Sequence, residues 1–208
     1  MIHSKDELLS MIHSYGILPF FTNVVQGWSV EEHIDPAVWF TSQEGPWEWK
    51  GQLASYKLCV YGKFIHNKAA FVSPEWFPDL ANYRRDGYDW EGWMDDGKAP
   101  YKDRLLMEYL VSHPYVQSRY AKRECGFSKG YDTVITRLQM QTYVVMADFQ
   151  YTATSVPSRK VKTISFPTVT QSAMPYHSSR VKSSTLPLCF FSGLRYASFS
   201  TEMKMITN

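Results

Sequence analysis

The sequence lacks the residue spacings that support disulfide frameworks and structural metal sites. It contains only three cysteines, Cys59, Cys125 and Cys189, and none of them belongs to a Cys-x-x-Cys pair. An odd number of widely spaced cysteines argues against both kinds of site and favours a reducing compartment. The six histidines form neither an HxH nor an HExxH pattern, so we expect no metal site.

Targeting segments and long apolar runs are absent as well. Residues 1–16 are amphipathic and contain acids, unlike a signal or transit peptide. No apolar run approaches the roughly 18 residues of a membrane span, and there is no glycine-rich phosphate loop or nucleophile elbow. We therefore expect a cytoplasmic protein that has no membrane span and needs no cofactor. The sequence leaves its oligomeric state open.

Aromatic residues and charges are present but unevenly distributed. All seven tryptophans lie before residue 94, and the 44% hydrophobic content is enough to build a core. Residues 149–208 carry seven Lys or Arg, a single acid, Glu202, and nineteen Ser or Thr. We interpret residues 151–208 as a basic, Ser/Thr-rich tail that is poorly ordered or foreign to the preceding fold. A translational frame change near residue 150 would produce the same shift.

Residues 1–99 have the patterns of a helical region that contains a β-hairpin. Capping residues and apolar spacing predict helices over residues 4–14 and 47–55. Residues 57–65 and 69–73 alternate as two strands do, and His66-Asn67-Lys68 has the character of a turn between them. Residues 76–93 are rich in aromatic rings.

Residues 100–150 have the order of a winged helix-turn-helix. Helical spacing predicts helices over residues 101–111, 115–124 and 131–140, and Val and aromatic residues predict a strand over 143–149. The third helix is the one that would enter a major groove. The fold class is therefore α+β, with the N-terminal helical and hairpin region packed on a winged helix.

Six stretches resemble the AlkZ-related protein family. They are Ser29–His33, Gly45–Trp49, Tyr61–Phe64, Phe71–Phe77, Ala81–Asp89 (ANYRRDGYD) and Leu138–Tyr143 (LQMQTY). Together they cover most of residues 1–150, and ANYRRDGYD is the most specific. The family is similar to winged-helix DNA glycosylases of the AlkZ/YcaQ type, which excise alkylated bases. After Gln150 the sequence departs from the family, and we find no second wing strand there.

The resemblance implies a catalytic motif at Gln139-Met140-Gln141, which matches the glycosylase pattern of Gln, an apolar residue, then Gln or Asp. On an extended segment Gln139 and Gln141 would share one face and could position one water. A carboxylate would then have to take the proton, and Asp148 and Asp132 are the nearest in sequence. If the helix instead runs through Gln141, the two amides diverge by about 200° and form ordinary polar surface.

Candidate DNA contacts are basic and aromatic. Arg84 and Arg85 would contact phosphates and stack on bases, or would form ion pairs with Asp86 and Asp89. The third helix and the residues before it supply Lys129, Tyr131, Thr133, Thr136 and Arg137, and the second helix supplies Lys122 and Arg123.

Three functions fit these patterns. The first is a DNA-binding protein related to alkyl-base glycosylases, in which Gln139 and Gln141 position water. The second is a non-catalytic winged-helix module that binds DNA or a protein. The third is an interaction protein with a Trp-rich interface. The surroundings of the two glutamines and the charge of the third helix discriminate between them.

Overall fold

The computed structural model describes residues 1–39, 44–151 and 160–165. These residues form both helices and strands, which confirms the α+β class. The α-helices are α1 (Lys5–Tyr15), α2 (Pro46–Ser55), α3 (Phe77–Arg85), α4 (Trp90–Asp95), α5 (Tyr101–Ser112), α6 (Ser118–Glu124) and α7 (Tyr131–Met140). The strands are β1 (Ile17–Pro19), β2 (Val60–Ile65), β3 (Lys68–Val72), β4 (Tyr115–Gln117), β5 (Val145–Tyr151) and β6 (Lys160–Ser165), and short 3-10 turns cover Glu31–His33 and Pro36–Val38.

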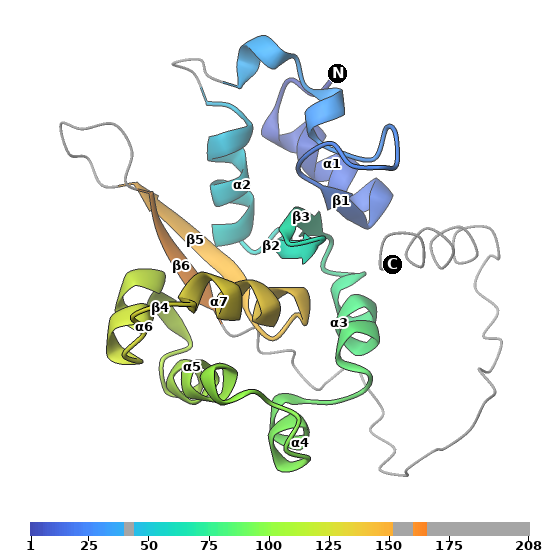
Figure 1. The fold of residues 1–208 in the computed structure, drawn as a ribbon. Helices are drawn as coiled ribbons and strands as arrows, with labels where there is room; N and C mark the ends of the chain where they lie inside the picture. The colour runs from blue at the N-terminus through green and yellow to red at the C-terminus, as the bar shows by residue number, and fades with distance from the viewer. Residues whose placement is uncertain (40–43, 152–159, 166–208) are drawn as a thin grey trace, which may run out of the picture. The chain divides into compact units, whose positions relative to one another are not determined.

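One antiparallel sheet connects the two ends of the described chain (Figure 1). Its strand order is β1-β3-β2-β5-β6-β4. The hairpin of β2 and β3 joins the later strands where Tyr61 pairs with Met146. Strand β6 pairs with β5 on one side and with β4 on the other. The N-terminal hairpin and the C-terminal strands therefore belong to the same sheet.

The first helix ends where local chemistry and packing require it. The Ser4 hydroxyl caps α1 by accepting a hydrogen bond from the backbone N–H of Glu7 at 3.2 Å. Gly16 ends the helix with a φ of +74°, and a Cβ at this position would lie 2.7 Å from the Trp76 ring. The close approach of Trp76 thus requires glycine here.

Aromatic rings fill the core between the hairpin and β5. Phe20 lies 6.2 Å from Tyr61 and 5.7 Å from Phe71, measured between ring centroids. Phe149 of β5 lies 5.6 Å from Tyr61. Such edge-to-face and tilted pairs add about 0.5–1.5 kcal/mol each beyond the area they bury. They hold the hairpin against the strand that follows α7.

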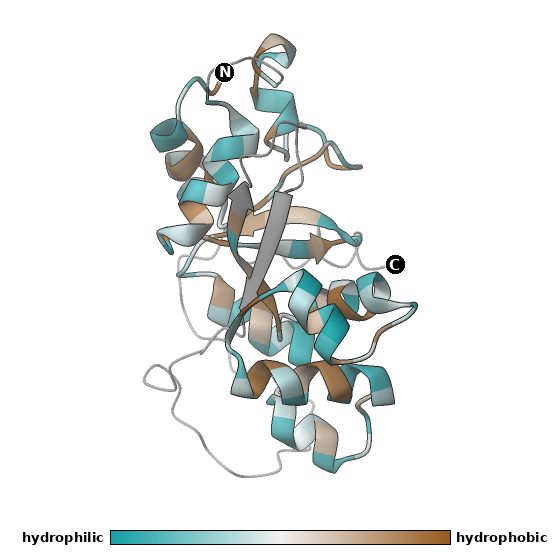
Figure 2. Ribbon diagram, turned by 90° about the vertical axis from the view of Figure 1, so that its left-hand side faces the viewer, coloured by the Kyte–Doolittle hydropathy of each residue, from teal (hydrophilic) through white to brown (hydrophobic). Residues whose placement is uncertain are grey.

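The later helices are amphipathic, and teal and brown residues alternate along them in the hydropathy view (Figure 2). The helix predicted over residues 115–124 is instead β4 followed by α6, because Tyr115–Gln117 is extended and pairs with β6. No strand was predicted after residue 150, yet β6 lies at Lys160–Ser165. The alternation of polar and apolar residues in β6 is short and lies within Ser/Thr-rich sequence, so it is a weak indication of a strand. Tyr151, the first residue predicted as tail, ends β5, and the remaining residues of that range, apart from β6, lie outside the described residues.

Candidate functional site

Gln139 is part of the internal structure of the protein. It lies in the last turn of α7 and is 3% exposed. Its Oε1 accepts a hydrogen bond from the backbone N–H of Lys63 at 2.8 Å, and its Nε2 lies 3.6 Å from the Met146 sulfur. The side chain thus joins α7 to β2 and β5, the two central strands of the sheet.

Gln141 has different surroundings. It is the C-cap of α7, so the expectation that both glutamines lie on an extended segment is wrong. The helical alternative describes the site better, because Gln139 is helical and Gln141 ends the same helix. The Gln141 Oε1 is buried, and no described atom forms a hydrogen bond with it. An unpaired buried amide oxygen costs free energy, so this atom is the unsatisfied acceptor of the motif.

The two adjacent arginines of α3 contact different segments. Arg84 donates from Nη2 to the Phe64 carbonyl at 3.1 Å, and its Nε is buried without a described partner. Arg85 donates from Nη2 to the Thr142 carbonyl at 2.6 Å and from Nε to the Thr142 hydroxyl at 3.1 Å. Burial lowers the pKa of both guanidinium groups from its usual value.

The alternative ion pairs of these arginines are not seen. Among the residues that the structure describes, neither Asp86 nor Asp89 forms an ion pair with Arg84 or Arg85. Both guanidinium groups are instead bound by backbone and hydroxyl oxygens, and the Arg85 Cζ lies 4.7 Å from the centre of the Tyr143 ring. Arg85 is therefore tied to the segment that follows the glutamine motif.

Asp148, the predicted proton acceptor, lies on β5 and is half-buried. One carboxylate oxygen accepts a hydrogen bond from the backbone N–H of Phe149 at 2.7 Å. The register of β5 shifts between Met146 and Asp148. Because Met146 contacts Gln139, the same strand passes the motif and carries this carboxylate.

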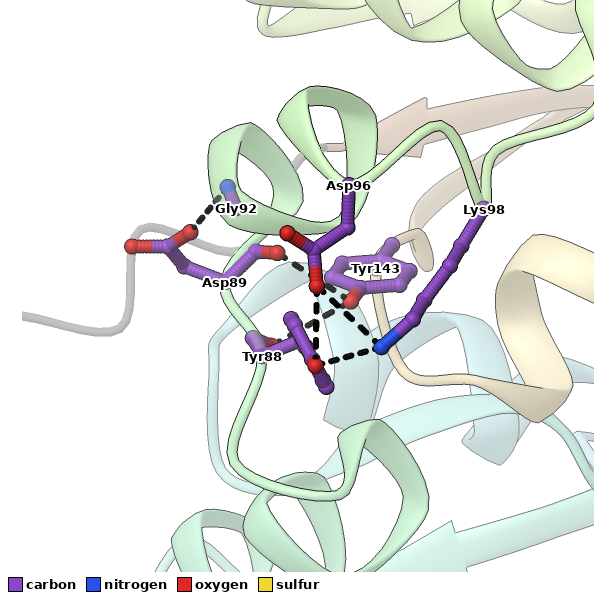
Figure 3. Close-up of polar contacts among 6 residues, drawn as sticks. All are labelled: Tyr88, Asp89, Gly92, Asp96, Lys98 and Tyr143. Atoms are coloured by element: carbon purple, nitrogen blue, oxygen red, sulfur yellow. Dashed lines mark hydrogen bonds and ion pairs between the residues drawn. The ribbon is translucent and has the colours of Figure 1, made fainter. Parts of the chain in front are cut away.

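A cluster of rings and charges packs against Tyr143, two residues after Gln141 (Figure 3). The Tyr143 hydroxyl donates to the Tyr88 carbonyl at 3.2 Å, and burial raises the pKa of its phenol to about 12. Lys98 contacts both the Tyr88 hydroxyl and, at 3.2 Å, the Asp96 carboxylate. The hydrogen bond with Tyr88 is the main cause of the raised pKa of Lys98. Trp93 stacks on the Tyr143 ring at 5.6 Å. The aromatic segment predicted from the sequence thus supports the end of α7.

Most polar side chains of α7 are engaged within the fold. The Tyr131 ring is 3% exposed and its oxygen accepts from the Ser118 hydroxyl at 3.0 Å. Arg137 forms a two-bond ion pair with Asp103, a fully buried carboxylate, and Nε to Oδ2 is 2.7 Å. Thr136 accepts from the Lys63 ammonium at 2.9 Å. Of the predicted contacts on this helix, Thr133 alone is exposed.

The other predicted DNA contacts lie on the surface. Lys122, Arg123 and Lys129 are all exposed. The Arg123 guanidinium pairs with Glu124 at 2.6 Å, and this hydrogen bond is the main cause of its raised pKa. Lys122 and Arg123 extend from α6, whereas Lys129 lies in the turn before α7.

The described residues contain no helix that is both long and apolar enough to cross a membrane. Over the same ranges, no group of three or more His, Cys, Asp or Glu side chains is placed to hold a metal ion.

A family model described as AlkZ related matches residues 2–176, so the expectation that the sequence departs from the family after Gln150 is wrong. The chain belongs to the AlkZ-related family. Searches of curated proteins and of solved structures found no match. Two stretches of this AlkZ-related chain that are far apart in sequence meet in the structure: ANYRRDGYD supplies Arg85, and LQMQTY supplies Thr142.

Two exposed residues of α6 in this AlkZ-related protein were not among the predicted contacts. Arg119 and Tyr120 lie beside Lys122 and Arg123, and the two guanidinium carbons lie 4.7 Å and 5.2 Å from the centre of the Tyr120 ring. The sequence does indicate that these residues belong together, because residues 119, 122 and 123 have the i, i+3, i+4 spacing of one helical face. We call Arg119, Tyr120, Lys122 and Arg123 the α6 face.

Proposed function

We propose that this AlkZ-related protein binds duplex DNA through the α6 face of a winged helix. Helix α5, strand β4, helices α6 and α7, and strands β5 and β6 follow one another in the order of that motif. The pairing of β4 with β6 supports the assignment, because the short strand after the first helix completes the wing sheet in such domains.

The observation that carries this proposal is the exposed positive charge of the α6 face. Arg119, Lys122 and Arg123 are all exposed, and Glu124, which pairs with Arg123, is the single acid of the helix. Guanidinium and ammonium groups bind phosphate oxygens through charge-assisted hydrogen bonds. Helix α7 offers less, because Arg137 and Thr136 are engaged within the fold. We therefore expect binding that depends on salt more than on base sequence.

Fluorescence anisotropy with a labelled duplex tests this proposal. Lys122→Ala should weaken binding and reduce the slope of log affinity against log salt by about 1, the loss of one phosphate contact. Lys68→Ala is the matched control, because Lys68 is an exposed lysine on β3. Equal effects of the two variants would refute the α6 face as the binding surface. Equal affinity for all polyanions would leave a protein partner as the better hypothesis.

Hydrolysis of an N-glycosidic bond is a second candidate function, and one observation favours it. The Gln141 Oε1 is a buried acceptor without a described partner at the end of the motif shared with alkyl-base glycosylases. In this reaction a water oxygen attacks the anomeric carbon, the base leaves, and a carboxylate accepts the proton. We assign the water contact to Gln141 alone, since Gln139 is engaged with Lys63, and the proton to Asp148.

Release of 7-methylguanine from methylated duplex DNA tests this second function. Wild-type protein should release the base without added metal, and Gln141→Ala should abolish release while remaining folded. Asp148→Asn should also lose activity, because an amide does not accept the proton. Absence of release by folded wild-type protein would overturn the activity on this lesion and leave the non-catalytic DNA-binding module.

A further inference from the structure

Thr142, the residue after Gln141, has an unfavourable backbone conformation. Its φ is +65°, and its side chain is fully buried. The other non-glycine residues with positive φ in the described part of the chain are exposed: Lys57, His66, Asn67 and Asp86. A β-branched residue in this region is a genuine outlier, because its Cβ substituents crowd the backbone.

The position of Thr142 at the end of α7 explains its positive φ but does not explain why the residue is a threonine. The N–H of Thr142 donates to the Gln139 carbonyl at 2.8 Å, and the N–H of Tyr143 donates to the Leu138 carbonyl at 2.9 Å. These are the two bonds of a Schellman motif, in which glycine is the usual residue at the left-handed position. A threonine there needs an additional interaction that offsets the cost.

Arg85 provides that interaction. One guanidinium group donates to the carbonyl of Thr142 at 2.6 Å and to its hydroxyl at 3.1 Å, and it lies over the Tyr143 ring. Within the described residues no carboxylate lies at ion-pair distance from Arg85. The hydroxyl of Thr142 in turn donates to the Gln141 carbonyl at 2.5 Å. Glycine would keep the carbonyl contact but has no hydroxyl, so it could not form the bonds of the hydroxyl with Arg85 and with the Gln141 carbonyl.

We propose that Arg85 is a positioning residue, which holds the Gln141–Thr142 turn so that the Gln141 amide keeps the orientation needed for reaction. Arg85 acts through Thr142 and does not contact the substrate. The neighbouring Arg84 contacts the Phe64 carbonyl and not this turn. The inference rests on the proposed role of Gln141 in base release, and its structural part can be tested separately.

Loss of the guanidinium should relax the turn. Displacement of a catalytic group by about 1 Å lowers rates by up to about 100-fold. We therefore expect Arg85→Ala to lower the single-turnover rate of 7-methylguanine release by about 10-fold to 100-fold, measured at saturating DNA. The affinity for DNA should stay within about twofold, because the α6 face is intact. Arg84→Ala, corrected for the folded fraction, is the matched control and should retain most of the rate.

Substitution of Thr142 separates positioning from stability. Glycine adopts positive φ without a Cβ penalty, so Arg85→Ala/Thr142→Gly should regain most of the rate that Arg85→Ala loses. A merely stabilising Arg85 would not give this rescue at a fixed folded fraction. Absence of rescue, or an unchanged rate in folded Arg85→Ala, would overturn the proposal.

Backbone chemical shifts of Thr142 and Tyr143, measured by NMR, test the turn without any activity. They should change in Arg85→Ala and remain native in Arg84→Ala. If wild-type protein releases no base, the glycosylase function fails, and these shifts still decide whether Arg85 holds the turn. Unchanged shifts in Arg85→Ala would refute the proposal that Arg85 holds the Gln141–Thr142 turn.

Discussion

The polar side chains of α6 reach solvent, whereas most of those of α7 bind other parts of the fold. Arg119 and Lys122 on α6 are exposed. Arg137 and Gln139 on α7 are engaged with Asp103 and Lys63. These two helices, which follow one another in sequence, therefore differ in what their polar residues can do. A side chain is available to a ligand only where tertiary packing leaves it unoccupied.

The largest effect should come from breaking the ion pair on α7. Arg137→Ala leaves the buried Asp103 carboxylate without its partner, which we expect to lower the unfolding free energy by about 3 kcal/mol. This is the lower end of the usual range, because the Arg137 side chain is 40% exposed. Chemical denaturation at pH 7 measures the loss. Arg104→Ala, which removes a half-exposed pair with Glu108, is the control and should cost under about 0.5 kcal/mol; similar losses would contradict the prediction.

A smaller loss is expected from the motif glutamine that faces inward. Gln139→Ala leaves the backbone N–H of Lys63 unpaired in a half-buried site, which should cost about 2 kcal/mol. Gln141→Ala removes an oxygen that has no described partner and should cost less. The same denaturation experiment compares the two variants. A larger loss for Gln141→Ala would show that the assignment of internal and available glutamine is reversed.

Alkaline pH should weaken the start of α7. Burial raises the pKa of Tyr131 to about 12 from a usual value of 10. The folded state therefore holds this proton more tightly than the unfolded state does, so its stabilisation is complete below pH 10 and is lost as pH rises towards 12. We expect a loss of up to about 2 kcal/mol over this interval. Tyr131→Phe should reduce the loss of stability above pH 10 and leave the part that comes from Tyr143, whose pKa burial also raises to about 12. An unchanged profile would refute this origin.

The smallest effect on stability should come from the α6 face. Simultaneous replacement of Arg119, Lys122 and Arg123 by alanine should change the unfolding free energy by no more than about 0.5 kcal/mol per site. DNA binding should nevertheless be lost. A strongly destabilised triple variant would remove the contrast between the two helices.

Helices with clear apolar spacing could be predicted from the sequence. The helices expected over residues 101–111 and 131–140 differ from α5 and α7 by at most one residue at either end. Each carries a buried stripe, such as Val134, Ile135 and Leu138, that repeats with the helical period. Strand β4 was missed because three extended residues directly before a helix leave almost no pattern of their own.

The partners of the polar residues could not be predicted in the same way. Arg137 binds Asp103, 34 positions earlier, and Gln139 binds Lys63, 76 positions earlier. Spacing within one helix indicates which face a residue is on but not which distant segment packs there. The sequence therefore offered no means of separating the two members of the glutamine motif.

The shared sheet has a consequence for how the protein opens. Tyr61 of β2 pairs with Met146 of β5 and also packs against Phe149. Each of these two strands therefore covers what would otherwise be an exposed edge of the other. Separating them would expose unpaired backbone and aromatic rings at the same moment. Amide hydrogens of β2 and β5 should therefore exchange with solvent in a single cooperative event, with equal opening free energies. A fragment cut at residue 100 should lose protection in its remaining strands.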